Sequence, residues 1–414
     1  MNPSEAESDV IVVGAGIGGA VLALALGQRG WKIKLLERDK QPPRIARPEI
    51  LWGATPRALD RLGIGERIRT QASVRLAGIE ATEGERRLVT VSSDLMRRAG
   101  AEAFSTDPAA SRAVILDAAL ATGNVTLLRG AEVTELLPSD GLTRSVRGTI
   151  HGRALAERAR LVVGDDGARS RARESLAIRL ETKIFPLDFI TAAIRWPSEL
   201  PADRARIFLR PSALRRGLPG AGFVPWPAGE GALLIPLPHD RVERVFADGT
   251  DAFWSSFSEL TSLAARLREQ LRFPDDFTRV RRPFGHAARY VSDCAAVIGD
   301  AAHPVSPVGG QGANASIADA LVLAEVAHEG LLAGDLSCKR LARYEALRRP
   351  ANARSVAFTV RGARAFAVLS RAPGLSWIVR VMLAALEASP PLKRRLLRAA
   401  STTFVGQSQQ KGTA

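Results

Sequence analysis

Glycines and acids occur in two patterns, one near each end of the chain, that suit the binding of a large polar cofactor. Near the N-terminus, three glycines with the spacing G-x-G-x-x-G follow the apolar run Val10–Val13. In the last third of the chain, Gly299 and Asp300 follow a second apolar run and lead into a loop rich in glycine and proline. Such segments offer main-chain N–H groups to phosphates and a carboxylate to hydroxyl groups. The two patterns therefore predict two halves of one nucleotide-binding site.

The N-terminal half has the features that a dinucleotide site needs. Gly14 permits a tight turn after the strand, Gly16 lets the backbone approach a pyrophosphate, and Gly19 lets the next helix pack closely. Glu37 stands about 20 residues further on, where a carboxylate can bind ribose hydroxyls. The alternative is a plain strand–turn–helix with tolerated glycines. The residues predicted to bind the cofactor here are Gly14, Gly16, Ile17, Gly18, Gly19, Glu37 and Arg38.

The C-terminal half supplies a second carboxylate and a second set of N–H groups. Asp300 suits the sugar-alcohol chain of a flavin, and the glycines after Pro307 place N–H donors near the flavin's pyrimidine edge, where they stabilise the charge of the reduced ring. The alternative is a long surface loop before a helix. The residues predicted to bind the cofactor here are Asp300, Pro307, Gly309, Gly310, Gln311, Gly312, Ala313 and Asn314.

A third segment, Asp165–Gly167, follows the apolar run Leu161–Val163. Asp166, with nearby Ser170 and Arg173, can organise the region around the pyrophosphate, although a charged turn explains the same residues equally well. Arg112, in the first turns of a predicted helix, can reach the cofactor phosphates, or it is an ordinary solvated arginine. His303 lies inside the second cofactor loop, which favours a structural role over that of a catalytic base. We name no catalytic residue and predict no metal site.

The elements that must position these residues follow from local patterns. A strand over 10–13, a helix over 17–29 and a strand over 33–36 form one β-α-β unit, and a further helix is expected over 112–121. Dense prolines and short alternating runs over 180–285 indicate antiparallel strands, interrupted by a helix over about 251–271. Residues 313–349 read as helical. The boundaries predicted are 1–75, 101–180 and 286–350 for a discontinuous cofactor domain, 76–100 and 181–285 for a substrate domain, 351–404 for C-terminal helices and 405–414 for a disordered tail.

Composition limits the class of protein and its partners. The chain has 414 residues, of which 46% are hydrophobic, and a formal net charge of +15. The two cysteines form no disulfide framework, which favours a reducing, cytoplasmic compartment. No basic-aromatic module for nucleic acid appears. Residues 351–404 combine arginines with apolar residues, so our hypothesis is peripheral contact with the inner membrane face, against the alternative of helices that pack on their own domain.

The three motifs together resemble those of the single-component, class A FAD-dependent monooxygenases with the para-hydroxybenzoate hydroxylase fold. The resemblance covers residues 9 to about 325. It implies an α/β fold, in which a Rossmann-like FAD domain of the GR2 type carries an inserted, mostly antiparallel substrate sheet and a C-terminal helical segment. It also implies FAD contacts by Glu37, Arg112, Asp300 and the loop 307–314, and a link of Asp166 to both FAD and NAD(P)H. The region around Arg47–Glu49 and the basic C-terminus look more like ubiquinone-pathway hydroxylases and squalene epoxidase.

The implied reaction consumes NAD(P)H and O2 and hydroxylates or epoxidises an aromatic or lipophilic substrate, such as a quinone, quinolone, polyketide or isoprenoid, through a flavin C4a-hydroperoxide. Asp165 departs from the family pattern, which often has a small residue there; a second acid can repel a 2′-phosphate, so the choice between NADH and NADPH stays open. An FAD-dependent reductase or oxidase of a lipophilic substrate is the alternative, and a non-enzymatic membrane-surface flavoprotein is a further one. The substrate, the regiochemistry and the oligomeric state are not predicted.

Overall fold

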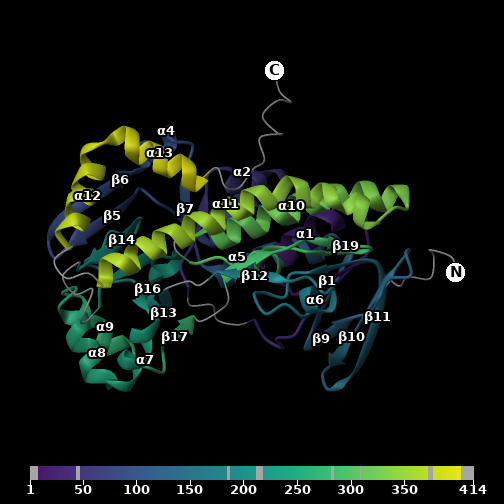
Figure 1. Ribbon diagram of the computed structural model, residues 1–414, viewed down its shortest axis with the longest axis horizontal. Helices are drawn as coiled ribbons and strands as arrows, with labels where there is room; N and C mark the ends of the chain where they lie inside the picture. Colours follow the sequence, from purple (N-terminus) through teal and green to yellow (C-terminus); the bar gives the residue numbers. More distant parts are fainter. Residues whose placement is uncertain are drawn as a thin grey trace.

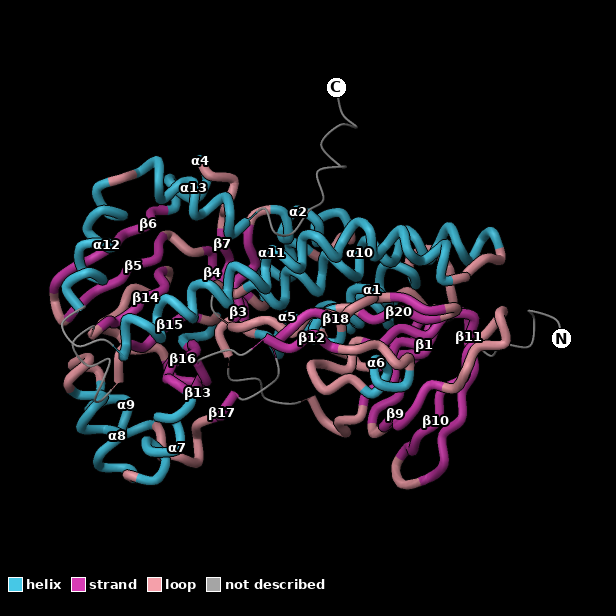
Figure 2. The backbone as a smooth tube through the Cα atoms, viewed as in Figure 1, coloured by secondary structure: helices cyan, strands magenta, loops and turns pink. Residues whose placement is uncertain are grey.

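The computed structural model describes residues 8–42, 47–183, 187–210, 218–280, 284–307, 309–371 and 376–401. The predicted tail 405–414 and Val308 of the predicted cofactor loop lie outside these residues. Two blocks of strands stand side by side, and the long helix α11 (Cys338–Arg371) runs from one block to the other (Figures 1 and 2).

The first block is a mostly parallel sheet built around the N-terminal strand. Its central strands are parallel, with Val10 opposite Leu161 on one side and Ile33 on the other. Five neighbouring strands run in the same direction, so their carboxyl ends meet at one edge. The order is β19 (Val291–Ser292), β20 (Ala295–Val297), β11 (Arg153–Gly164), β1 (Ser8–Val13), β2 (Ile33–Glu37) and β8 (Val125–Arg129), with β9 (Ala131–Leu136) and β10 (Arg144–Ile150) paired antiparallel beside β11.

Helices bury this sheet, which explains why its strands are continuously apolar. α1 (Ile17–Gly27) packs against both α5 (Pro108–Ala121) and α10 (Gln311–Ala333). The predicted start of α5 at residue 112 is wrong by one turn, because Asp107 caps the helix through the N–H of Ala109 at 2.8 Å and Pro108 fits its first turn. The predicted helical stretch 313–349 is also interrupted, since α10 ends at Gly334 in the left-handed conformation.

The second block is a seven-stranded sheet that the chain enters twice. β5 (Gly78–Glu83) pairs in parallel with β14 (Arg204–Leu209), and the remaining pairs are antiparallel. The order is β17 (Thr278–Val280), β13 (Leu187–Arg195), β16 (Glu230–Pro238), β15 (Gly220–Pro225), β14, β5 and β6 (Arg86–Ser92). Residues 78–92 thus join the sheet formed by residues 187–280.

Three helices cover one face of the second sheet: α7 (His239–Ala247), α8 (Gly249–Ser258) and α9 (Ala264–Gln270). The sequence predicted one helix over 251–271, and this is wrong. The chain turns between α8 and α9, where the Thr261 hydroxyl accepts the N–H of Leu263 at 3.3 Å. Aromatic side chains fill this core; the rings of Phe253 and Phe273 stack with centroids 4.2 Å apart.

Short elements join the two blocks. β3 (Glu49–Trp52), β7 (Ala103–Thr106) and β4 (Ser73–Arg75) form a small antiparallel sheet, and β12 (Leu180–Lys183) pairs with β18 (Phe284–Ala287) where the chain crosses between the blocks. The remaining elements are α2 (Ala54–Arg61), α3 (Gly65–Gln71), α4 (Ser93–Arg98), α6 (Arg171–Ser175), the 3₁₀ turns η3 (Pro227–Gly229) and η4 (Gly299–Ala301), and the C-terminal helices α12 (Ser376–Ala388) and α13 (Pro390–Ser401). α12 packs on β6 and α13 on α4, at the upper left of Figure 1.

Candidate active site

The three predicted motifs meet at the carboxyl edge of the first sheet. Main-chain hydrogen bonds connect the strand ends: the N–H of Asp165 donates to Val13 at 2.8 Å, and the N–H of Ile298 donates to Gly164 at 2.9 Å. The N–H of Gly14 donates to Leu36 at 2.8 Å. Segments that are far apart in sequence are therefore adjacent at the place where open α/β sheets bind ligands.

The glycine turn presents the N-terminus of α1. Gly14 has φ +102°, and a side chain there would collide with the carbonyl of Asp165, so the turn requires glycine. α1 begins at Ile17, and its cap residue Gly16 offers no side-chain bond. The first N–H groups of the helix must therefore bond to a side chain from elsewhere in the chain or to a ligand, as in dinucleotide sites.

Glu37 is buried beside this turn. Its carboxylate accepts the N–H of Ala15 at 3.1 Å and that of Asp39 at 2.9 Å. Arg38 points into solvent and pairs with Asp39 at 3.8 Å. Of the two predicted residues, Glu37 lies beside the glycine turn, whereas the side chain of Arg38 is exposed.

Arg112 lies buried on α5, and its Nη2 atom has no hydrogen-bond partner among the described residues. Burial lowers the pKa of Arg112, against the opposing charge of Glu37. An arginine at this depth retains its charge. A buried cation with an unused donor calls for an anion, which a phosphate group supplies.

The loop after Pro307 is held by Asn314. The side chain of Asn314 donates to the carbonyls of Ile50 and Gly310, both at 2.7 Å, and accepts the N–H of Trp52 at 2.9 Å. Gly310 has φ +61° and precedes α10, so the loop turns sharply into the helix. These bonds occupy the amide group of Asn314, whose side chain therefore holds the loop in place.

Several predicted residues in this loop have side chains already engaged with the protein. Gln311 is buried and donates to the carbonyl of Gly309 at 3.0 Å. Pro307 accepts the N–H of Gly310 at 3.0 Å, and Ala313 packs against the core of the first sheet. Gly312 lies near Val305, which a side chain there would touch at 3.6 Å. The loop therefore offers a shaped main chain rather than reactive side chains.

A buried polar network supports the turn that carries Asp300. Asp319 accepts the N–H of Gly299 at 3.1 Å, Nε of Arg348 at 2.8 Å and a short hydrogen bond from His303. Asn352 donates to the same carboxylate at 2.9 Å. Burial opposes ionisation of Asp319, but His303 and Arg348 outweigh it and hold the pKa of Asp319 well below its usual range. His303 thus belongs to a structural network.

The Asp165–Gly167 segment supports the turn that carries Asp300. Asp166 accepts the N–H of Ala172 at 3.0 Å and caps α6, and the Ser170 hydroxyl accepts the N–H of Arg173 at 2.8 Å. Arg173 then donates to the carbonyl of Ala301 at 2.9 Å. Burial raises the pKa of Asp166. These residues join the Asp-Gly segment to the turn that holds Asp300.

A model of the FAD binding domain family matches residues 7–359. The chain belongs to this family. It is 29% identical to 6-methylpretetramide 4-monooxygenase of Streptomyces rimosus, over 95% of this chain and 92% of the relative. It is 30% identical to ubiquinone hydroxylase UbiL of Rhodospirillum rubrum, over 96% and 90%. The crystal structure of p-nitrophenol 4-monooxygenase PnpA from Pseudomonas putida DLL-E4 superimposes with a TM-score of 0.76 at 20% identity, covering 95% of this chain and 98% of that one.

The match confirms the predicted family, fold class and FAD cofactor, and the relatives place the chain among flavin-dependent monooxygenases. The residues present fit FAD. The unused Nη2 of Arg112 suits a phosphate, Glu37 suits a ribose, and the glycine-rich N-terminus of α1 suits the pyrophosphate. When bound, FAD supplies the redox chemistry. Among the described residues, no cluster of His, Cys, Asp and Glu could hold a metal ion.

Sequence reasoning missed several residues at this site. Asp319, Arg348 and Asn352 come from the middle of long helices and carry no motif, so only their packing reveals them. The sequence analysis linked Asp165 to the choice between NADH and NADPH. In the structure its carboxylate lies under the glycine turn, where it accepts the N–H of Gly19 at 2.7 Å. The sequence did contain a signal for this role, because an acid stands at position 165, where the resemblance led us to expect a small residue.

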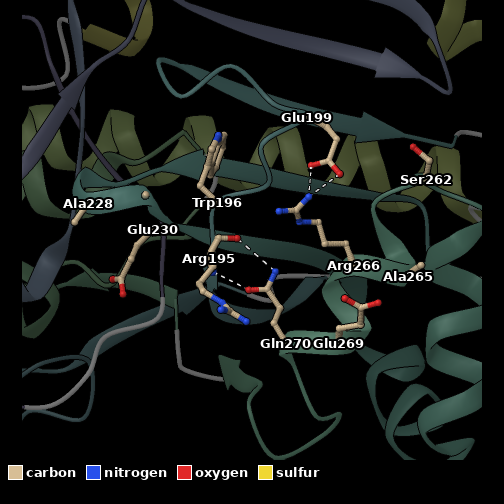
Figure 3. Close-up of a pocket in the computed structure, with 11 residues that line it drawn as sticks. Arg195, Trp196, Glu199, Ala228, Glu230, Ser262, Ala265, Arg266, Glu269 and Gln270 are labelled. Carbon is tan, nitrogen blue, oxygen red and sulfur yellow. Dashed lines mark hydrogen bonds and ion pairs between the residues drawn. The ribbon is translucent and has the colours of Figure 1, made fainter.

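A separate pocket of about 880 Å³ lies between the end of β13, η3 and α9 (Figure 3). Its wall is mostly polar, and Arg266 pairs across it with Glu199 at 3.0 Å. None of the predicted cofactor residues lines this pocket. The size of a pocket alone does not identify an active site. The carboxyl edge of the first sheet, where the three motifs meet, therefore remains the candidate.

Proposed function

We propose that this chain is an FAD-dependent monooxygenase that uses NAD(P)H and O2 to hydroxylate or epoxidise a lipophilic aromatic substrate. Bound FAD supplies the activation of O2. The chain's own residues hold the cofactor, orient the substrate and exclude water. The names of the two relatives support this substrate class, since one refers to 6-methylpretetramide and the other to ubiquinone.

The observation that carries the proposal is the apolar face of the second sheet opposite helices α7–α9. Along β16, Leu233, Ile235 and Leu237 pack into the core beneath these helices. Because side chains alternate along a strand, Leu234 and Pro236 point to the other face, where both remain partly exposed. Partly exposed apolar side chains on an inner sheet face suit an apolar ligand.

This face adjoins the cofactor edge. Leu234 packs beside Phe189, in a cluster that includes Phe284 of β18 and Ala363 of α11. On the neighbouring strand, Val224 belongs to a cluster with Ala315, at the start of α10, and Trp52 of β3. An apolar wall therefore extends from the second sheet to the helix that follows the cofactor loop, which favours an aromatic or lipophilic substrate over a charged one.

The direct test is turnover by the purified protein. We expect a flavin absorption band, and NAD(P)H oxidation that accelerates with at least one member of a panel of quinones, quinolones, polycyclic phenols and polyenes. O2 consumption should match it, and the product should gain one oxygen atom. Substrate reduction under anaerobic conditions, without an oxygenated product in air, would instead establish the reductase alternative.

The position of the substrate is tested by filling the proposed wall. Leu234→Trp should raise KM for the substrate at least tenfold, since the larger ring occupies the ligand's space. FAD content should stay unchanged. Leu142→Trp, at an exposed position on the turn between β9 and β10, is the matched control. Equal kinetics in the two variants would place the substrate elsewhere.

Helix α12 has apolar residues on two faces. Leu383 and Leu386 pack on the second sheet, in a cluster with side chains of β5 and β6, and Arg380 pairs with Glu83 of β5 at 2.6 Å. Trp377, Val381 and Met382 are instead more than half exposed, at 58%, 55% and 59%. An ordinary surface helix is apolar only on the face toward the core.

We infer that α12 and α13 form a peripheral contact with an anionic membrane. Leu392 and Leu396 of α13 extend the apolar surface, and Arg394 and Arg395 beside them are exposed cations that match anionic lipid headgroups. Within the described chain, no helix has both the length and the hydrophobicity to traverse a bilayer. The proposed contact is therefore interfacial.

Liposome flotation tests this contact. Wild-type protein should float with vesicles of anionic lipid and less with neutral vesicles. The triple change Trp377→Ser, Val381→Ser and Met382→Ser should abolish flotation, whereas Leu332→Ser, at an exposed residue of α10, should not. Equal partitioning of the triple variant and the wild type would end the proposal.

A further inference from the structure

Asp165 occupies the junction of all three cofactor motifs. It follows the last residue of β11, and its Oδ2 accepts the N–H of Gly19 at 2.7 Å. A Cβ atom on Gly16 would lie 2.8 Å from the same oxygen. The carboxyl group therefore fills the space beneath the first turn of α1 and provides the helix cap that Gly16 lacks.

The other carboxyl oxygen reaches the turn that carries Asp300. A Cβ atom on Gly299 would lie 2.7 Å from Oδ1 of Asp165 and 2.5 Å from Oγ of Ser316. Gly18, in the first turn of α1, adjoins the same two side chains. The side chain of Asp165 thus connects the glycine turn to the Gly299 turn, and glycine is required at both because this side chain lies between them.

The charges around Asp165 are unfavourable to its ionised form. The glycine turn contributes no charged side chain, η4 contributes Asp300, α10 contributes Asp319 with its partners Arg348 and His303, and the next residue is Asp166. Burial of the carboxyl raises the pKa of Asp165 well above its usual value; the Gly19 N–H opposes this shift, and the neighbouring acids add to it.

FAD brings further negative charge to the same place. Its pyrophosphate is the group that the N–H donors of the α1 N-terminus would hold. An ionised Asp165 would compete for those donors and repel the phosphates, whereas a protonated Asp165 can still accept the Gly19 N–H. Binding and ionisation are then linked.

We propose that Asp165 is a positioning residue of the FAD site that must carry a proton when FAD is bound, so that FAD binding takes up a proton and weakens as pH rises. The inference rests on FAD occupying this edge of the sheet. It assigns to this chain a pH dependence of cofactor retention that a small residue at position 165 would not produce.

The test compares FAD affinity across pH in apoprotein prepared by removing the flavin. Quenching of flavin fluorescence gives the dissociation constant for wild type, Asp165→Asn and Asp165→Ala between about pH 6 and about pH 9. For wild type we expect the constant to rise with pH, by up to about tenfold per unit. Asp165→Asn keeps the size and an acceptor for Gly19 but cannot ionise, so its constant should be nearly independent of pH and lower than that of wild type at the alkaline end.

Two further measurements keep the proposal open to failure. Calorimetric titration of wild type at the alkaline end of this range, in buffers of different ionisation enthalpy, should show uptake of a proton on binding; no uptake there would overturn the proposal even if the variants fail to fold. Asp117→Asn, an exposed acid on α5, should keep the wild-type slope. If the FAD dissociation constants of wild type and Asp165→Asn change equally with pH, and the variant binds more weakly at every pH, the proposal fails and Asp165 acts only as a helix cap. Wild-type protein that binds no FAD at any pH would contradict the assignment of the cofactor site instead.

Discussion

The side chain of Asn314 accepts the main-chain N–H of Trp52 at 2.9 Å across a sequence separation of 262 residues. A second bond in the same direction reinforces the contact, since the Trp52 indole donates to the carbonyl of Gly309 at 3.0 Å. Together these bonds hold the second cofactor loop against β3. The loop is therefore positioned by the N-terminal part of the chain, and not only by the helix that follows it.

Asn314→Ala should destabilise the protein, because it removes three hydrogen bonds of a buried side chain and leaves the N–H of Trp52 without its partner. We expect a loss of about 2–4 kcal/mol in the free energy of unfolding, measured by denaturant titration. Gln28→Ala, whose side chain donates to Leu62 at an exposed position, should change stability by less than about 0.5 kcal/mol. Similar values for the two variants would contradict the role given to Asn314.

Arg112→Met should weaken FAD binding while leaving the apoprotein as stable as the wild type or more so. The guanidinium is buried with an unused Nη2 donor, which is unfavourable until a phosphate arrives. We expect FAD affinity to fall at least about tenfold, since charge-assisted hydrogen bonds contribute about 1.5–3 kcal/mol. Fluorescence titration measures the FAD affinity, and thermal unfolding measures the stability of the apoprotein. A variant that binds FAD normally would exclude Arg112 from the site.

Asp300→Ala should lose FAD on purification and keep the fold. The carboxylate is predicted to bind the sugar-alcohol chain of the flavin, and η4 is held by Asp319 and Arg173 independently of it. The flavin-to-protein ratio and the far-ultraviolet circular dichroism spectrum measure the two outcomes. Full FAD occupancy in this variant would count against the site.

His286 should make the protein lose stability as acid is added. It accepts or donates a 2.7 Å hydrogen bond with the Tyr290 hydroxyl, and burial, with added repulsion from His303 and Arg349, lowers the pKa of His286 from 6.5 to about 4. Between these values the unfolded chain binds a proton that the folded chain does not, so stability falls as pH drops from about 6.5 to about 4. The expected contribution is about 2–3 kcal/mol.

Denaturant titrations at several pH values measure this effect. His286→Gln keeps a hydrogen-bonding side chain without the proton equilibrium and should flatten the profile in that window. His151→Gln, on the exposed turn between β10 and β11, is the control and should leave the slope unchanged. A wild-type slope retained in His286→Gln would assign the acid sensitivity to another group.

The sequence by itself determined the motifs and the family, because these depend on short-range patterns. A buried strand followed by G-x-G-x-x-G, with Glu37 after the next strand, specifies a turn, a helix and a carboxylate within one β-α-β unit. The Gly299–Asp300 turn is equally local. These short motifs carry the resemblance that predicted the family, the fold class and the cofactor, and the family match confirms all three.

Only the tertiary structure decided which side chains support the motifs. Asp319 and Arg348 are unremarkable residues of long helices until α10 and α11 pack together and bring them to 2.8 Å. Asp165 could be read as a surface acid until the parallel pairing of β1 with β11 placed it under the glycine turn. The apolar residues of α12 are divided between a face that packs on β5 and β6 and an exposed face, and only the docking of the helix, with Arg380 bound to Glu83, decides which residues lie on which face. In each case the partner lies far along the chain, and packing rather than local propensity selects it.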